Sequence, residues 1–235
     1  MNPLSAIFGA GVAIRNALYD RGVFQVKKLD RPVVSIGNIS VGGTGKTPFV
    51  IALGQLLTER GIAFDVLSRG YGRCSTGIAI VDPNGSAAQF GDEPLLIARK
   101  LQAPVIVGAD RYQAGLLAEQ KFPSKLHLLD DGFQHRRLHR DFDIVLLPAE
   151  DQAGSLLPTG RLREPFTSLK RADAIVVFGS QELPKSVKTS WRVRRVIELP
   201  AAAGKLIAFS GIARPRQFIK GLKSSQLEIA GTVTF

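Results

Sequence analysis

Short apolar runs alternate with helical patterns along most of the chain. Runs of this kind, rich in valine, leucine and isoleucine, are typical of strands buried in a parallel sheet. We expect strands at residues 32–36, 62–67, 104–107, 126–131, 142–147 and 174–178. Helical patterns lie between several of these strands. One follows residue 46, a second begins at residues 91–94, and a third covers residues 111–121. The order predicts an α/β fold, a mainly parallel sheet with helices on both faces.

The pattern changes after residue 187. Residues 191–199 alternate as in a half-exposed strand, and further strands are expected at 205–210 and 231–235, with a helix between them. The 235 residues allow one large α/β domain, or one domain and part of a second. We therefore expect a core domain over 29–186 and, over 187–235, linker strands and an incomplete second α/β unit.

Residues 1–28 form a separate pattern at the N-terminus. Apolar residues recur at spacings of three and four, at Leu4, Ile7, Phe8, Val12 and Ile14, which predicts an amphipathic helix. Basic residues outnumber acidic ones over this end of the chain. A basic amphipathic helix can lie in a membrane interface. From this stretch alone, packing against its own domain is an equal alternative.

Residues 40–48 read Ser-Val-Gly-Gly-Thr-Gly-Lys-Thr-Pro, between an expected strand and an expected helix. This is the context of a phosphate-binding loop, in which glycines let backbone N–H groups face one anion. Lys46 can reach the β- and γ-phosphates, and the Thr47 hydroxyl can ligate Mg²⁺. Ser40 stands where the usual pattern has glycine. The expected nucleotide-binding residues are Ser40, Val41, Gly42, Gly43, Thr44, Gly45, Lys46 and Thr47.

Three aspartates could serve the same site. Asp130 and Asp131 end an apolar strand, and ligands bind at the carboxyl ends of parallel strands. An acidic residue there helps to hold Mg²⁺ in phosphate-loop proteins. Asp92 opens a helix, so the sequence favours it as an N-cap, although a kinase also needs a base for the attacking hydroxyl. A basic cluster at 135–140 fits a solvated surface or a phosphate site.

The composition of the chain limits the classes of partner that it can bind. The net charge of +11 favours an anionic partner, such as a nucleotide, a phospholipid surface or a phosphorylated substrate. Nucleic acid is disfavoured, because the charge is scattered and no basic–aromatic platform is present. No apolar run reaches the ~20 residues of a membrane-spanning helix. The single cysteine, Cys74, excludes an internal disulfide. Absence of an Asn-Lys-x-Asp motif favours ATP over GTP.

Several motifs, in order, resemble the tetraacyldisaccharide 4′-kinase family, the lipid A 4′-kinases of Gram-negative bacteria. Besides the loop, they are Ser-Arg-Gly-Tyr-Gly-Arg at 68–73, Gly-Asp-Glu-Pro at 91–94, Asp-Asp-Gly-Phe-Gln-His at 130–135 and the stretch 157–165. Residues 210–215 fit more weakly. The resemblance spans essentially the whole chain.

The resemblance implies ATP-dependent phosphorylation of the 4′-hydroxyl of a tetraacylated glucosamine disaccharide 1-phosphate. It implies a peripheral protein at the cytoplasmic face of the inner membrane, with residues 1–28 associating with that anionic surface and with ATP and Mg²⁺ as cofactors. It makes Asp92 the base, beside Lys46 and Asp131 as catalytic residues. The implied Mg²⁺ site is Thr47, Asp130 and Glu93. The implied substrate contacts are Arg69, Arg73, His135 and Glu164.

One departure from the family pattern concerns the end of the chain. In the family, the strand that begins like Gly231–Phe235 continues into a Pro-Asp-His-His segment, and one of those histidines assists the base. This chain ends at Phe235, so the resemblance implies a C-terminal truncation. The alternative function is that of a soluble phosphate-loop ATPase, a switch or a chaperone, without a lipid substrate.

Overall fold

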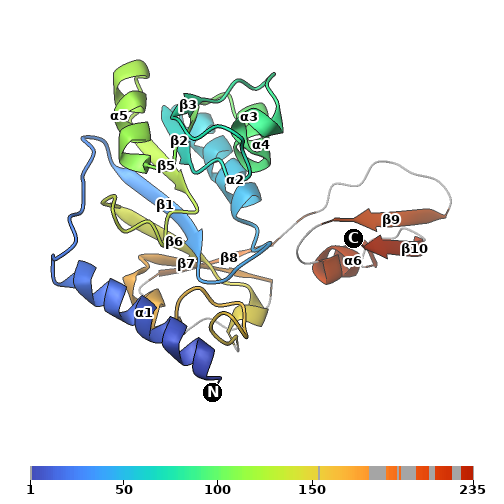
Figure 1. The fold of residues 1–235 in the computed structure, drawn as a ribbon. Coiled ribbons are helices and arrows are strands. Elements are labelled where there is room, and N and C mark those ends of the chain that lie inside the picture. The colour runs from blue at the N-terminus through green and yellow to red at the C-terminus, as the bar shows by residue number, and fades with distance from the viewer. Residues whose placement is uncertain are drawn as a thin grey trace.

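The protein is seen here as a computed structural model. It describes residues 2–152, 154–179, 189–194, 196, 205–211, 215–223 and 229–234. Most of these residues belong to one α/β body, and a smaller helix-and-strand unit follows it along the chain (Figure 1).

The α/β body is built on an eight-stranded sheet in the order β3-β4-β2-β5-β1-β6-β7-β8. All neighbouring strands run parallel except β3 and β4. The central strand β1 lies between β5 and β6, so the segments that follow these three strands meet at one edge. The strands are β1 Val33–Asn38, β2 Phe64–Ser68, β3 Ala79–Ile80, β4 Val105–Val107, β5 Leu126–Asp130, β6 Phe142–Leu146, β7 Ala174–Phe178 and β8 Thr189–Val193.

Helices cover both faces of this sheet, as the sequence predicts. On one face, Val50 of α2 and Ile97 of α4 pack with Ile36 of β1 in a buried apolar cluster. On the other face, α5 packs on Leu67 and Ile106, and a further cluster around Phe133 lies under the segment 149–171. These elements are α2 Lys46–Glu59, α3 Ala87–Phe90, α4 Asp92–Lys100, α5 Arg111–Lys121 and the 3-10 helices η1 Ala149–Asp151 and η2 Phe166–Arg171.

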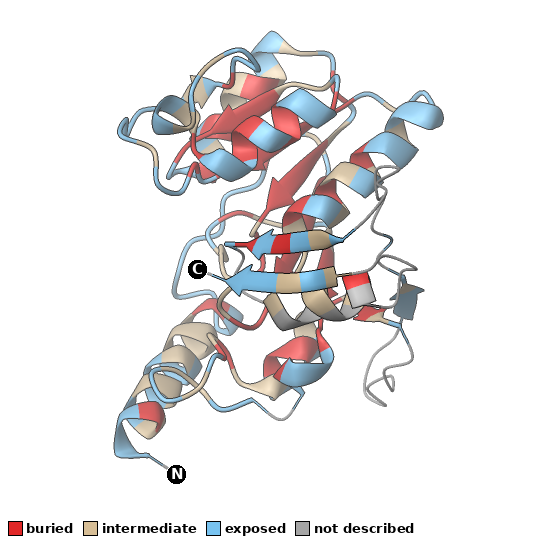
Figure 2. Ribbon diagram, turned by 90° about the vertical axis from the view of Figure 1, so that its right-hand side faces the viewer, coloured by how far each residue is buried: buried red, intermediate tan, exposed pale blue. Residues whose placement is uncertain are grey.

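Helix α1, Pro3–Asp20, confirms the predicted N-terminal helix and packs loosely (Figure 2). Asn2 caps it by accepting a hydrogen bond from the Leu4 N–H at 3.0 Å. Only Ser5 and Tyr19 are buried, whereas Ile7 is 70% exposed and Ile14 62% exposed. No helix in the described part of the chain is both long enough and apolar enough to span a bilayer.

The position of strand β8 differs from the one that the sequence predicts. The strand expected at 191–199 is observed at Thr189–Val193, where it pairs in parallel with β7 and extends the main sheet. The smaller unit contains β9 (Leu206–Ser210), α6 (Pro215–Lys223) and β10 (Ile229–Thr234), with β9 and β10 in parallel. The domain boundary expected at residue 187 lies outside the described residues and stays a prediction.

Candidate active site around the phosphate loop

The glycine-rich segment lies between β1 and α2, at the centre of the sheet. Its backbone turns at Gly42, with φ of 78°, and at Gly45, with φ of 91°, which is the N-cap of α2. These left-handed values suit glycine because it lacks a Cβ. Thr44 is 2% exposed, and its Oγ1 has no hydrogen-bond partner among the described residues. A buried donor without a partner inside such a loop fits an anionic ligand.

The loop lysine faces the end of the neighbouring strand. Lys46 Nζ donates to Asn38 Oδ1 at 3.2 Å and lies 3.4 Å from Asp131 Oδ1. Its side chain is only 12% exposed. The structure therefore brings together Lys46 and Asp131, which the sequence predicts in one site although 85 positions separate them (131 − 46).

Asp131 is held as an anion. Arg163 Nη1 donates to Asp131 Oδ2 at 3.0 Å and to Oδ1 at 3.3 Å. Burial alone would raise the pKa of Asp131, but Lys46 and Arg163 together lower it below its ordinary value. Asp131 also has a φ of 51°, which is uncommon outside glycine.

The pKa of Asp130 is shifted in the opposite direction to that of Asp131. Burial, with the charges of Glu93 and Asp131, raises its pKa to about 7. Ser68 Oγ donates to Asp130 Oδ2 at 3.0 Å, whereas Oδ1 is buried without a partner among the described residues. A buried carboxylate oxygen in this state fits a hard cation such as Mg²⁺.

The donor set for Mg²⁺ is small. Within the described ranges, no three His, Cys, Asp or Glu side chains form a ready-made metal site. Mg²⁺ beside phosphates keeps several waters and uses one or two carboxylates, so a site built on Asp130 needs few other protein ligands. Glu93 is exposed, and its charge acts on Asp130.

Asp92 is not the cap of its helix. The N-cap of α4 is Gly91, with φ of 90°, and Asp92 is the first helical residue. A Cβ on Gly91 would lie 2.8 Å from the Tyr71 carbonyl oxygen, so the loop after β2 packs directly against the start of α4. The capping interpretation is therefore wrong. Asp92 is exposed, which leaves its carboxylate accessible to a ligand.

The two predicted arginine contacts differ in their surroundings. Arg69 is exposed and lies close enough to the buried Arg111 to add to the effect of burial, which lowers the pKa of Arg111 to about 10. Arg73 instead braces its own loop, since its guanidinium donates to the carbonyl oxygens of Thr76 and Gly77. Of this pair, Arg69 is the one that the structure presents to solvent.

Glu164 lies inside the protein as a link between segments. It is 1% exposed. Its carboxylate accepts hydrogen bonds from Asn16 at 2.9 Å, Gln134 at 3.1 Å and Arg171 at 2.6 Å. Helix α1, the segment after β5 and η2 are joined through this one carboxylate. The carboxylate of Glu164, which was expected to contact the substrate, instead accepts hydrogen bonds from donors of the protein itself.

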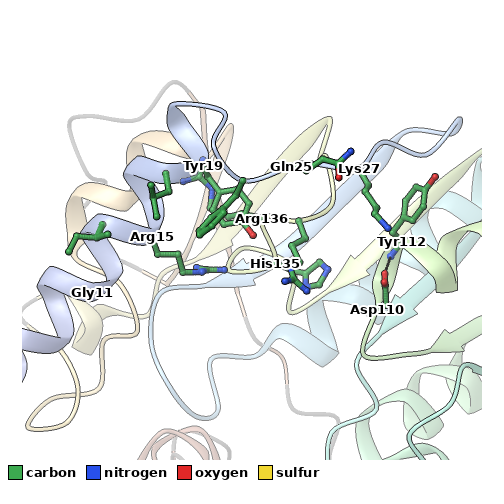
Figure 3. Close-up of a pocket in the computed structure, with 13 residues that line it drawn as sticks. Gly11, Arg15, Tyr19, Gln25, Lys27, Asp110, Tyr112, His135 and Arg136 are labelled. Carbon is green, nitrogen blue, oxygen red and sulfur yellow. Dashed lines mark hydrogen bonds between the residues drawn. The ribbon is translucent and has the colours of Figure 1, made fainter.

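His135 lines a cavity of about 830 Å³ between α1 and the start of α5 (Figure 3). Burial, followed by the charge of Arg111, lowers the pKa of His135 to about 4, so the imidazole is neutral at pH 7. Basic and apolar side chains share the walls: Ile14, Arg15, Leu18, Tyr19, Phe24, Lys27, Arg136 and Arg137. Such a mixed lining suits a ligand that carries both anionic and apolar groups.

Sequence reasoning overlooked three residues that organise the site. Asn38 accepts from Lys46, Arg163 binds Asp131, and Asp151 accepts from Ser40. Arg163 lies within the motif stretch 157–165, and Asn38 ends the strand that leads into the loop, so both had a usable signal. Asp151 follows β6 with no motif of its own, so only the strand order places it beside the loop.

The sequence of the chain is similar to those of known proteins. The model of the LpxK family, tetraacyldisaccharide-1-P 4′-kinase, matches residues 1–235. The chain belongs to this family. A tetraacyldisaccharide 4′-kinase of Koribacter versatilis is 55% identical over 248 residues, covering 100% of this chain and 77% of the relative. That of Aquifex aeolicus is 40% identical, covering 99% of this chain and 80% of the relative.

A solved structure agrees with the fold. The "apo" form of LpxK from Aquifex aeolicus in complex with ATP has a TM-score of 0.86 and 39% identity, covering 99% of this chain and 80% of that chain. The similarity confirms the α/β fold and the family resemblance. No comparison tests the individual site residues, which stay predictions.

Proposed function

We propose that this chain transfers the γ-phosphate of ATP to the 4′-hydroxyl of a tetraacylated glucosamine disaccharide 1-phosphate. Membership of the tetraacyldisaccharide-1-P 4′-kinase family supports this function over that of a soluble ATPase. The observation that carries it in the structure is the meeting of Lys46 with Asp131 at the mouth of a phosphate loop.

In this mechanism the loop N–H groups and Lys46 bind the β- and γ-phosphates and stabilise the charge that develops during transfer. The exposed Asp92 orients the sugar hydroxyl and accepts its proton. Arg163 keeps Asp131 ionised beside Lys46. Asp130, Thr47 and Glu93 would hold Mg²⁺, which would neutralise the negative charge of the phosphates when bound.

The proposal also includes a binding cavity for the lipid substrate and a helix that contacts the membrane surface. The cavity beside His135 offers basic and apolar side chains together, as an acylated sugar phosphate requires. The exposed apolar residues Leu4, Ile7 and Ile14 of α1 favour peripheral association with an anionic membrane. For this family we place that surface at the cytoplasmic face of the inner membrane.

A transfer assay with radiolabelled ATP and the tetraacylated disaccharide 1-phosphate tests the function. Changing Lys46→Ala or Asp92→Ala should lower the rate by about 100-fold or more, since each removes a group that acts during transfer. Asp82→Ala, in an exposed turn, is the matched control and should leave the rate unchanged.

Near-normal rates for Lys46→Ala and Asp92→Ala would overturn the assigned roles. A wild-type chain that hydrolyses ATP without labelling the lipid would instead favour the alternative, a phosphate-loop ATPase without a lipid substrate.

A further inference from the structure

The phosphate loop begins at a buried serine whose hydroxyl is already engaged. Ser40 stands where the usual pattern has glycine, and it is fully buried. Its Oγ donates a hydrogen bond to Oδ2 of Asp151. Asp151 is 2% exposed and ends η1. A buried carboxylate therefore binds the first residue of the loop.

The strand order explains why Asp151 reaches Ser40. Strand β6 pairs in parallel with β1, and Leu146 lies opposite Asn38 at the last position of both strands. The two strands end at the same edge of the sheet, so the segments that follow them lie side by side. Because η1 begins shortly after β6, the carboxylate of Asp151 comes to lie at the entrance of the loop.

The backbone around Ser40 is fixed on both sides. Asn38 Nδ2 donates to the Ser40 carbonyl oxygen at 2.7 Å, and the same amide accepts from Lys46 through Oδ1. The Val41 N–H donates to the Arg161 carbonyl oxygen at 2.8 Å. The entrance to the loop is thus held by hydrogen bonds within the protein, and Asn38, which makes one of them, also accepts from Lys46.

We propose that Asp151 is a positioning residue of the phosphate loop. By accepting a hydrogen bond from the Ser40 hydroxyl, it fixes the backbone that enters the loop, so that the N–H groups of residues 42–47 are arranged for a triphosphate. Ser40 then contributes through its anchored backbone, and its hydroxyl is directed at Asp151. The inference rests on the proposed function and concerns its nucleotide site.

Preorganisation predicts an effect on nucleotide affinity. A loop that must be ordered by its ligand binds more weakly, because part of the binding free energy is consumed in ordering it. Removing a hydrogen bond to a buried charged acceptor should therefore raise the Kd for ATP by about tenfold or more. The KM for the lipid substrate should stay unchanged, since Asp151 is buried at the entrance of the loop and contacts it through Ser40.

Titration calorimetry with ATP and Mg²⁺ on the whole chain measures this affinity. Asp151→Ala and Ser40→Ala should each raise the Kd for ATP about tenfold or more. The Kd of the double variant should not exceed that of the weaker-binding single variant. Asp151→Asn keeps an oxygen that accepts the hydroxyl, so its Kd should stay within about threefold of wild type.

Asp143→Ala is the matched control. Asp143 is also buried, at 5% exposure, but lies at the opposite end of β6, where it pairs with Arg140. This variant should lower the melting temperature without changing the Kd for ATP. If Asp151→Ala does not fold, Ser40→Ala carries the test. It leaves the Asp151 carboxylate in place and removes the hydroxyl, which donates to Asp151 and accepts from Asn38 Nδ2 at 3.3 Å.

Wild-type ATP affinity in Asp151→Ala or Ser40→Ala, or an equal loss of affinity in Asp143→Ala, would overturn the inference while leaving the proposed function intact. A wild-type chain that binds no ATP would overturn both.

Discussion

The surroundings of two neighbouring aspartates at the end of β5 shift their pKa values in opposite directions. Asp131 faces Lys46 and Arg163, which lower its pKa. Asp130 points into the protein, where burial raises its pKa to about 7. Groups whose surroundings separate their pKa values commonly take different roles. This separation supports Asp131 as the permanent anion beside Lys46 and Asp130 as the carboxylate that gains most from a bound cation.

His135 gives a pH dependence whose sign follows from its burial. Its pKa is lowered from 6.5 to about 4, so between these values the unfolded chain binds a proton that the folded protein excludes. The contribution of His135 to the free energy of unfolding should therefore be constant above pH 6.5 and fall as the pH drops toward 4. After screening by solvent, the contribution is about 1–2 kcal/mol.

Urea unfolding at a series of pH values measures this change. In His135→Gln, which has no titrating ring, the slope between pH 4 and pH 6.5 should be smaller than in the wild-type protein. Identical pH profiles for the two proteins would contradict the assignment.

At the scale of elements, Glu164 joins α1 to the α/β body. Removing its carboxylate in Glu164→Ala would deprive the buried Arg171 of its partner and Asn16 of its acceptor. Breaking a buried ion pair from one side costs about 3–5 kcal/mol of unfolding free energy. We also expect α1 to be cut more readily by protease, because few of its side chains are buried.

Urea denaturation and limited proteolysis test this link. Glu59→Ala, at the exposed end of α2, is the control and should change the unfolding free energy by less than about 0.5 kcal/mol. If Glu164→Ala were as stable as this control, the carboxylate would not hold α1 in place.

The elements themselves were largely predictable because their signals are local. Apolar runs marked the strands of the parallel sheet, and the motif at 40–47 marked the loop between β1 and α2. Contacts between distant segments were not predictable in this way. Asp151 meets Ser40 only because β6 lies beside β1, and Gly91 rather than Asp92 caps α4 because tertiary packing overrides local capping preference.

For the molecule as a whole, charge and exposed apolar surface act together. The net charge of +11 attracts the chain to anionic surfaces, and the attraction is screened by salt. Charge alone gives weak binding, so the apolar side chains of α1 must supply the remainder. Since α1 is also hydrogen-bonded to Gln134 and Glu164 beside the proposed active site, a surface that binds α1 would bring the proposed catalytic residues close to a lipid substrate.

Flotation with anionic vesicles tests this arrangement. Ile7→Ser with Ile14→Ser should greatly reduce the floating fraction, because each buried isoleucine contributes about 1.5–3 kcal/mol. Both side chains are exposed in the free protein, so the melting temperature should stay constant. Ala13→Ser, also exposed on α1, should float like the wild type. A wild-type chain that stays in solution with anionic vesicles at low salt would contradict the membrane proposal and favour the soluble alternative.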